Sequence, residues 1–324
     1  MTDVPRSRPG GGFVTFLLVT TGLAVTLAAL VRLFGIDGTR YMLATTALTP
    51  YVLVLGVLTG LVALLVKRWA VALVTLLLSA VLTAAVAPRA FPDSRPVGVG
   101  RPLKVMSMNL LVGKADAEAL VEQVRRHDVD VLALQELTPA MVADLDRAKL
   151  AQALPYRVFR DEPGGSGSGI ASRYPVTARD LTPPSTLRQA GALVDLPGRD
   201  VEIVSVHPLP PVVPEGPEQW QRDLAGLPAR TLTGPIRVLA GDFNATLDHA
   251  SLRRLLNTGY VDAADQVGDG LAPTWPADSP WWPPGVTIDH VLVDNRCPVD
   301  TFEVVDVPGS DHRAIVSRFV VPAP

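Results

Sequence analysis

The sequence predicts an α/β domain that follows a membrane anchor. Three long apolar segments occupy the amino-terminal part of the 324 residues. Beyond them, short apolar segments of strand length alternate with amphipathic segments of helical period. Several of the short segments end in an acidic, amide or histidine side chain, and the carboxyl ends of strands are where open α/β sheets bind their ligands.

The three apolar segments, at about residues 13–34, 42–66 and 69–87, are each long enough to form a transmembrane helix. They account for an apolar content of 48% and a mean hydropathy of +0.28. A cleaved signal peptide is the alternative for the first segment alone. Three successive segments favour a permanent anchor formed by residues 1–87.

Basic residues beside these segments predict the orientation of the anchor. Arg6 and Arg8 precede the first segment, and Lys67 with Arg68 lies between the second and third. Because basic flanks tend to stay in the cytoplasm, an odd number of helices places the rest of the chain on the extracytoplasmic side. We therefore expect a multi-pass membrane protein with a Pro- and Gly-rich linker at 88–102 and a catalytic domain at 103–324.

Amphipathic segments at 115–127 and 138–150 predict two helices in this domain, and Thr138 is the expected N-cap of the second. A loop at 207–220 contains five prolines and is expected to be largely without secondary structure. A second loop, at 274–285, carries Trp281 and Trp282. These tryptophans either pack onto the domain or form an aromatic rim that meets lipid headgroups or an apolar substrate.

The stretch from 236 to 249 is the one around which the candidate site is organised. Its apolar start predicts a buried strand, and Asp242 and Asn244 follow at the carboxyl end. Side chains two residues apart in extended chain point the same way. A carboxylate there can orient or deprotonate a water, and an amide can donate to a phosphoryl oxygen. The alternative for Asp242 is that it caps the following helix.

Other predicted strands carry polar residues at comparable positions. They are Asn109 after the strand at 104–110, Glu136 after 130–136, His207 after 201–208, Asp289 in 287–293, and Asp311 with His312 before the last strand. Each motif alone is weak evidence for a catalytic site, since a histidine at a strand end is often a plain surface residue. Their combination in one domain favours a catalytic site.

The motifs SMN, LQE, SVH, GDFNA, IDHVLV and SDHR, spread over residues 103–320, resemble those of the endonuclease/exonuclease/phosphatase (DNase I-like) superfamily. The resemblance implies a four-layer α/β sandwich, in which two packed mixed β-sheets are flanked by helices. It also implies a metal-dependent hydrolase that acts on phosphate ester bonds.

Carried onto this sequence, the resemblance implies that Glu136 and Asn109 hold a divalent cation. Mg²⁺ is expected, with Mn²⁺ or Ca²⁺ as alternatives, because hard cations prefer oxygen ligands. Asp311 would serve the metal or the attacking water. Asp242 would align or activate that water, and Asn244 would hold the phosphoryl group.

The two histidines have related implied roles. His312, steadied by Asp289, would contact a phosphate oxygen, because a carboxylate partner fixes the imidazole tautomer and favours its charged form. His207 would stabilise charge or protonate the leaving group. Arg173 could aid phosphate binding, or it could simply pair with a carboxylate in its loop. His290 should face away from the site, and His127 and His249 are given no role.

Charge and the anchor together predict the class of substrate. From Gly100 onward the chain has 21 Lys and Arg against 29 Asp and Glu, a net charge of −8. This balance makes nucleic acid a less expected partner, because phosphate neutralisation by basic residues supplies most non-specific affinity for DNA. We expect a lipid-linked phosphate or pyrophosphate, such as a polyprenyl pyrophosphate, held at the bilayer. A membrane-anchored nuclease is the first alternative, and a non-catalytic binding or sensor module is the second.

Overall fold

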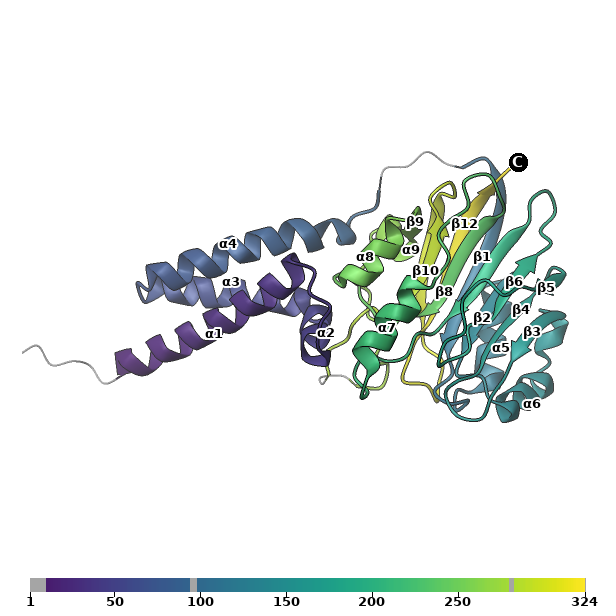
Figure 1. Ribbon diagram of the computed structural model, residues 1–324, viewed down its shortest axis with the longest axis horizontal. Helices are drawn as coiled ribbons and strands as arrows, with labels where there is room; N and C mark the ends of the chain where they lie inside the picture. Colours follow the sequence, from purple (N-terminus) through teal and green to yellow (C-terminus); the bar gives the residue numbers. More distant parts are fainter. Residues whose placement is uncertain (1–9, 94–97, 280–282, 324) are drawn as a thin grey trace, which may run out of the picture.

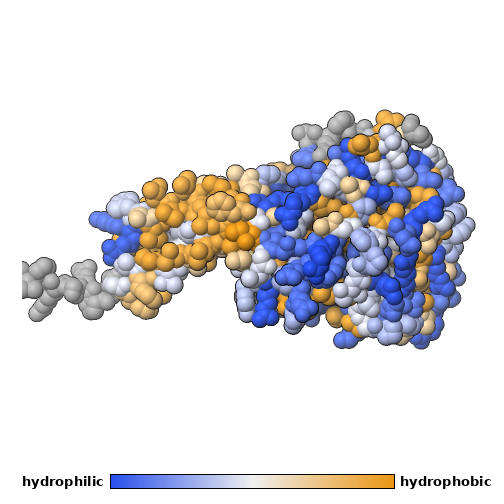
Figure 2. Space-filling model, in the orientation of Figure 1, coloured by the Kyte–Doolittle hydropathy of each residue, from blue (hydrophilic) through white to orange (hydrophobic). Residues whose placement is uncertain are grey.

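The computed structural model describes residues 10–93, 98–279 and 283–323. It consists of an elongated helical bundle attached to one side of an α/β domain (Figure 1). The bundle contains α1 (Gly10–Leu33), α3 (Thr49–Leu65) and α4 (Trp69–Val86), and the short α2 (Arg40–Ala47) lies across its base against the domain. The surface of the bundle is strongly apolar, whereas that of the domain is mostly polar (Figure 2).

Two helices, Gly12–Leu33 and Trp69–Ala90, are long and apolar enough to cross a membrane. The second predicted span, at 42–66, is not one continuous helix, because α2 and α3 are bent by 72° at Leu48. Pro50 lies in the first turn of α3 and has no backbone N–H to donate to a preceding turn. Proline suits the first turn of a helix, so α3 begins here and the chain bends just before it.

The α/β domain contains two six-stranded mixed sheets, with orders β11-β12-β1-β2-β4-β3 and β5-β6-β7-β8-β10-β9. The strands of the first sheet are β1 (Gly100–Asn109), β2 (Val131–Gln135), β3 (Tyr156–Arg160), β4 (Ser168–Ser172), β11 (Val299–Val305) and β12 (Ala314–Pro322). Those of the second are β5 (Val176–Ala178), β6 (Gly191–Val194), β7 (Val201–Val206), β8 (Ile236–Asp242), β9 (Tyr260–Asp262) and β10 (Asp289–Asp294). Each sheet has one parallel pair, β1 with β2 and β7 with β8.

Helices cover the outer face of each sheet, which completes the four layers. They are α5 (Ala117–Arg126) and α6 (Pro139–Arg147) on the first sheet, and α7 (Gly216–Ala225) and α8 (Ala250–Leu256) on the second. The remaining short helices are η1 (Ala87–Ala90), η2 (Leu150–Gln152) and α9 (Ala263–Val267). The predicted two-sheet sandwich with flanking helices is therefore confirmed.

Alternation along the strands explains this layering. In β1, Leu103 and Val105 lie in the core between the sheets, whereas Met106 and Met108 pack under α5 and α6. The inner half of β1 is therefore buried on both faces, and apolar side chains occupy both of them.

Two sequence expectations need correction. The proline-rich loop at 207–220 contains the start of α7, which begins at Gly216 with a proline in its first turn and buries Trp220. Proline is well suited to a first helical turn, because its N–H would be unpaired there in any case. The expected linker is also shorter than 88–102, since η1 occupies its start and β1 begins at Gly100.

Candidate functional site

Five strand ends meet at one edge of the sandwich. The parallel register sets Asn109 of β1 beside Gln135 of β2, and Val206 of β7 beside Gly241 of β8. Glu136, His207 and Asp242 stand at or directly after these ends. In the antiparallel pair of β8 with β10, Asp289 is directly opposite Asp242. The topology thus gathers residues that are far apart in sequence.

Asp242 is the centre of this group and is only 2% exposed. Its Oδ2 lies 3.1 Å from Asn109 Nδ2, 3.6 Å from His312 Nε2 and 3.7 Å from His207 Nε2. Its Oδ1 accepts a hydrogen bond of 2.8 Å from the backbone N–H of Asn244. Burial raises the pKa of Asp242 and the nearby carboxylate of Asp289 adds to the rise, while the positive charge of His312 opposes it.

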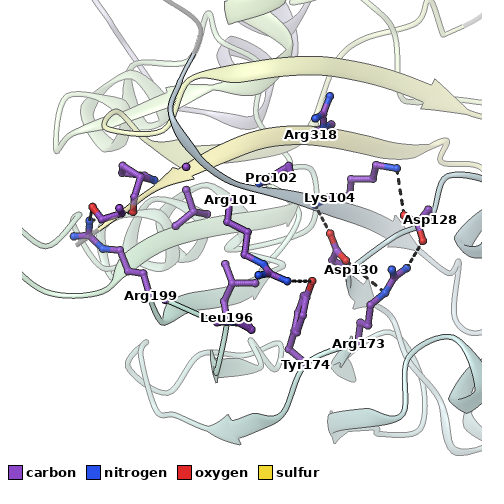
Figure 3. A pocket seen from close by; sticks show the side chains of 16 residues that line it. Arg101, Pro102, Lys104, Asp128, Asp130, Arg173, Tyr174, Leu196, Arg199 and Arg318 are labelled. Carbon is purple, nitrogen blue, oxygen red and sulfur yellow. Dashed lines mark hydrogen bonds and ion pairs between the residues drawn. The ribbon is translucent and has the colours of Figure 1, made fainter.

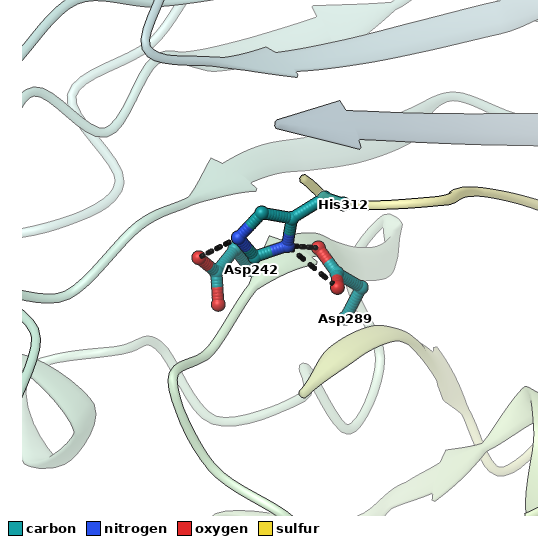
Figure 4. A group of neighbouring side chains, drawn as sticks. All are labelled: Asp242, Asp289 and His312. Atoms are coloured by element: carbon teal, nitrogen blue, oxygen red, sulfur yellow. Dashed lines mark hydrogen bonds and ion pairs between the residues drawn. The ribbon is translucent and has the colours of Figure 1, made fainter. Parts of the chain in front are cut away.

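His312 lies between two carboxylates (Figure 4). Its Nδ1 is 2.9 Å from Asp289 Oδ2, and its Nε2 faces Asp242. Burial by itself would lower the pKa of His312, but the carboxylates of Asp289 and Asp242 outweigh it and raise the pKa to about 10. The ring is therefore an imidazolium at neutral pH. Thr274 Oγ1 accepts hydrogen bonds from the backbone N–H groups of Ile288 and Asp289 and so holds the start of β10 in place.

His207 is in a different electrostatic setting. It is 2% exposed, and burial lowers its pKa more than the nearby Asp242 raises it. Its Nδ1 is buried without a hydrogen-bond partner in the described part of the chain. A neutral imidazole beside an imidazolium gives the site one group that can take up a proton and one that carries fixed positive charge.

Glu136 is close to Asp242, because Asn109 Nδ2 and His207 Nε2 lie near both carboxylates. Its Oε1 is 3.2 Å from Asn109 Nδ2, and its Oε2 accepts a 2.7 Å hydrogen bond from the backbone N–H of Val112. Asp311 has one carboxylate oxygen 3.0 Å from Trp275 Nε1, while the other is buried and unpartnered among the described residues. The carboxylate oxygens of Glu136 and the unpartnered oxygen of Asp311 are of the kind that Mg²⁺ prefers, whereas Asn109 Oδ1 already accepts a 3.0 Å hydrogen bond from the backbone N–H of Leu111.

Asp242, Asp289 and His312 could also hold an ion, since their ligand atoms lie within 4.8 Å of one another. In that group, however, the His312 ring fills the space between the carboxylates and already supplies positive charge. The described part of the chain thus offers this group and the oxygen ligands at Glu136 as two candidate positions for a cation.

The backbone around the site is strained. Glu136 and Asn244 have φ of 58° and 49°, and Leu111 and Val112, which follow Asn109, have φ of 48° and 55°. Residues with side chains adopt this left-handed region rarely, and it is most unfavourable for a β-branched residue such as Val112. Such strain persists only where surrounding contacts enforce it, and it concentrates at functional sites.

Arg173, predicted to bind substrate, is not gathered here. Arg173 follows β4 and lies at the opposite end of the sheet, since Ser172 pairs with Val131 at the start of β2. It is 2.5 Å from Asp128 and 3.4 Å from Asp130 in a separate cavity of about 900 Å³ (Figure 3). The arrangement matches the alternative expectation of a loop ion pair. Trp281 and Trp282 lie outside the described residues.

The histidines that were given no catalytic role are held by other contacts. His290 faces away from the site, with its Nδ1 2.8 Å from Asp262. His249 contacts the anchor, because its Nε2 is 3.0 Å from the backbone oxygen of Leu43 in α2. His127 is 3.6 Å from Glu303.

A groove of about 470 Å³ leads to the site, and one of its walls is α2. Its polar lining residues are Glu136, His207, Asp242, Asn244, His249 and His312. The rest of the lining is apolar, and comprises Leu43, Ala44, Ala47, Leu48, Pro210, Pro211, Val212, Trp275, Pro283, Pro284, Val286 and Ile288. The sequence did not indicate the α2 residues as part of the site, because they read as one end of a membrane span.

Buried polar contacts fasten the anchor to the loop and helix that follow Asn244. Asp248 accepts two 2.8 Å hydrogen bonds from Arg89 of η1 and one of 2.9 Å from Arg32 of α1. Asp37, between α1 and α2, accepts hydrogen bonds from the backbone N–H groups of Ala250 and Ser251 at the start of α8. The anchor therefore contacts the same segment that carries site residues.

Comparisons with known proteins agree with this geometry. The model of the endonuclease/exonuclease/phosphatase family matches residues 106–312. No curated protein matches the chain. Among solved structures, an endonuclease/exonuclease/phosphatase from Beutenbergia cavernae is 22% identical with a TM-score of 0.55, over 68% of this chain and 72% of that one. D. rerio TDP2, complexed with a single-strand DNA product, is 18% identical with a TM-score of 0.52, over 68% and 99%. Mannosyl-6-phosphatase Bt3783 from Bacteroides thetaiotaomicron is 16% identical with a TM-score of 0.50, over 68% and 100%.

Proposed function

The chain belongs to the endonuclease/exonuclease/phosphatase family of metal-dependent phosphoester hydrolases, and on this premise we propose that it hydrolyses a lipid-linked phosphate or pyrophosphate at a membrane surface. A polyprenyl pyrophosphate is the type of substrate that we propose. The reaction would be attack of water on phosphorus, with a bound Mg²⁺ ion supplying charge stabilisation and Mn²⁺ or Ca²⁺ as possible substitutes.

The observation that carries the proposal is the enclosed carboxylate of Asp242, with two imidazoles and an amide nitrogen within 3.7 Å. In this proposal Asp242 orients and deprotonates the water, and Asn244 donates to a phosphoryl oxygen. His312, kept charged by Asp289, neutralises the phosphate, and His207 assists the leaving group. Glu136, Asn109 and Asp311 would hold the metal.

The lipid-linked substrate is supported by the anchor. Residues 1–87 are proposed to cross the membrane three times, with α3 of the bent α2–α3 pair as the second span and residues 103–324 on the extracytoplasmic side. The buried ion pairs of Asp248 with Arg32 and Arg89 hold the domain directly against the base of the bundle. The bilayer is thus the proposed partner of the enzyme, and a phosphate at its surface is the nearest substrate.

A membrane-anchored nuclease is the alternative that the likeness to TDP2 brings forward. The net charge of −8 from Gly100 onward counts against it, because DNA binding without a basic surface loses most of its electrostatic affinity. A non-catalytic module is disfavoured, because the polar residues of every motif are present and converge.

The test uses the full chain in detergent micelles, assayed for phosphate release from farnesyl pyrophosphate and for cleavage of plasmid DNA. Asp242→Asn and Glu136→Gln should each lower turnover by roughly two orders of magnitude or more. Asp180→Asn, which changes an exposed carboxylate paired with Arg160, is the matched control and should keep full activity. Metal-dependent DNA cleavage without phosphate release would establish the nuclease instead, and full activity in either site variant would refute the assigned roles.

A further inference from the structure

Helix α2 belongs by sequence to the anchor, but it is built into the catalytic domain. Leu43 is 1% exposed and packs with Trp220 of α7 and Phe243, which separates Asp242 from Asn244. The backbone oxygen of Leu43 lies 3.0 Å from His249 Nε2. The position of α2 is therefore fixed relative to the site, and Ala44 and Ala47 are held as part of the groove wall.

The groove changes in character along its length. At its inner end are Asp242, Asn244 and His207, whereas its walls from α2 onward are apolar. Ile288 directly precedes Asp289, so apolar surface begins within one residue of the catalytic group. At the rim, Val212 is 59% exposed and extends the apolar surface outward.

The outer end of the groove lies at the base of the membrane bundle. Leu48, at the break between α2 and α3, lines it, and α3 continues from there into the bundle. Tyr51 of α3 donates a 2.7 Å hydrogen bond to the backbone oxygen of Gly285, next to the lining residue Pro284. The apolar lining of the groove thus borders the base of the bundle.

We propose that α2 and the loop at 210–212 form a subsite for the hydrocarbon chain of a lipid phosphate, with the chain attached directly to the phosphate that is hydrolysed. This inference rests on the proposed function and narrows its substrate. A chain that begins at the phosphate places carbon against Ala44, Ala47 and Ile288. A glycerophospholipid would place ester groups there, and burying them against apolar side chains without hydrogen bonds is unfavourable.

The small side chains of α2 make this subsite testable. Ala44→Phe and Ala47→Phe should each fill the groove and lower kcat/KM for farnesyl pyrophosphate in micelles by roughly tenfold or more. Hydrolysis of para-nitrophenyl phosphate, which is short and soluble, should change less than about twofold. Thr45→Phe adds a ring on the same helix outside the groove lining and is the matched control for both substrates. Melting temperatures of all variants check that the fold is intact.

A second variant avoids the packed helix. Val212→Ser changes an exposed rim residue, so it should leave stability unchanged and still lower farnesyl pyrophosphate hydrolysis severalfold, with para-nitrophenyl phosphate unaffected. The unmodified chain should also prefer farnesyl pyrophosphate to phosphatidic acid in the same micelles.

Equal losses on both substrates at unchanged stability, or equal rates on farnesyl pyrophosphate and phosphatidic acid, would overturn the subsite and leave the phosphoesterase in place. An unmodified chain that hydrolyses none of the three compounds would refute the proposed function itself, and the subsite with it.

Discussion

Replacing Asp248 by Asn should destabilise the protein strongly, although the residue is not part of the catalytic group. The Asp248 side chain is 1% exposed and neutralises Arg89 and Arg32, whose side chains are 8% and 11% exposed. Breaking a buried ion pair by removing one partner costs about 3–5 kcal/mol, because a charge remains in the interior without compensation. For a domain of this size, a loss of that order corresponds to a decrease in melting temperature of roughly 10 °C.

The measurement is thermal unfolding of the full chain in detergent, followed by circular dichroism. The control is Asp180→Asn, because Asp180 forms an ion pair of 2.6 Å with Arg160 but is 84% exposed. An exposed pair of this kind is worth about 0–1 kcal/mol, so its loss should barely change the melting temperature. Equal shifts for the two variants would refute the conclusion that Asp248 fastens the anchor to the domain.

The pH dependence gives a second check on Asp248. Burial by itself would raise its pKa, but the two arginines outweigh burial and lower it below 3.8. The stabilisation from its charge is therefore present above pH 3.8 and lost as the pH falls through the lowered pKa. The stability difference between the parent chain and Asp248→Asn should be constant near neutral pH and shrink only in strong acid.

Three further outcomes are expected. Excess chelator should abolish phosphate release, and added Mg²⁺ should restore it; activity that survives chelation would exclude the metal site at Glu136. Burial would lower the pKa of His290, but the carboxylate of Asp262 outweighs burial and raises the pKa above 6.5. The ion pair should therefore stabilise the fold fully below pH 6.5, and this stabilisation should be lost as the pH rises through the raised pKa. The stability gap between the parent chain and His290→Gln, measured by urea unfolding, should therefore be larger at about pH 6 than at about pH 9. A reporter active only outside the cell should work after residue 324 and fail within the turn at Lys67; the reverse pattern would invert the proposed topology.

The sandwich and the position of the site were predictable because their signals are local. Strands such as β8 are apolar runs that end in polar residues, and this pattern can be read from the sequence without knowing the tertiary contacts. Thr138 was also identifiable as an N-cap, and its side chain does accept a hydrogen bond from the backbone N–H of Met141.

The docking of the anchor was not predictable, because its contacts join residues about 200 positions apart. In the sequence, Asp37 and Asp248 are ordinary acidic residues beside apolar segments, and nothing nearby indicates that either is buried. The bend at Leu48 had a signal in Pro50, but a proline near the start of a span is compatible with a continuous helix as well as a broken one. The position of Arg173 was not predictable either, because only the strand pairing shows that it lies at the end of the sheet opposite the site.

The backbone is left-handed at four residues of the candidate site or beside it, Glu136, Asn244, Leu111 and Val112. This conformation lowers the stability of the fold while it holds the side chains proposed for catalysis. Each such residue costs the folded chain about 1–2 kcal/mol that glycine would largely avoid. Selection for heat resistance alone would therefore favour glycine at these four positions and would remove the carboxylate of Glu136 and the amide of Asn244 in the process. A more stable protein that lacks the proposed catalytic groups is the expected end of such a selection.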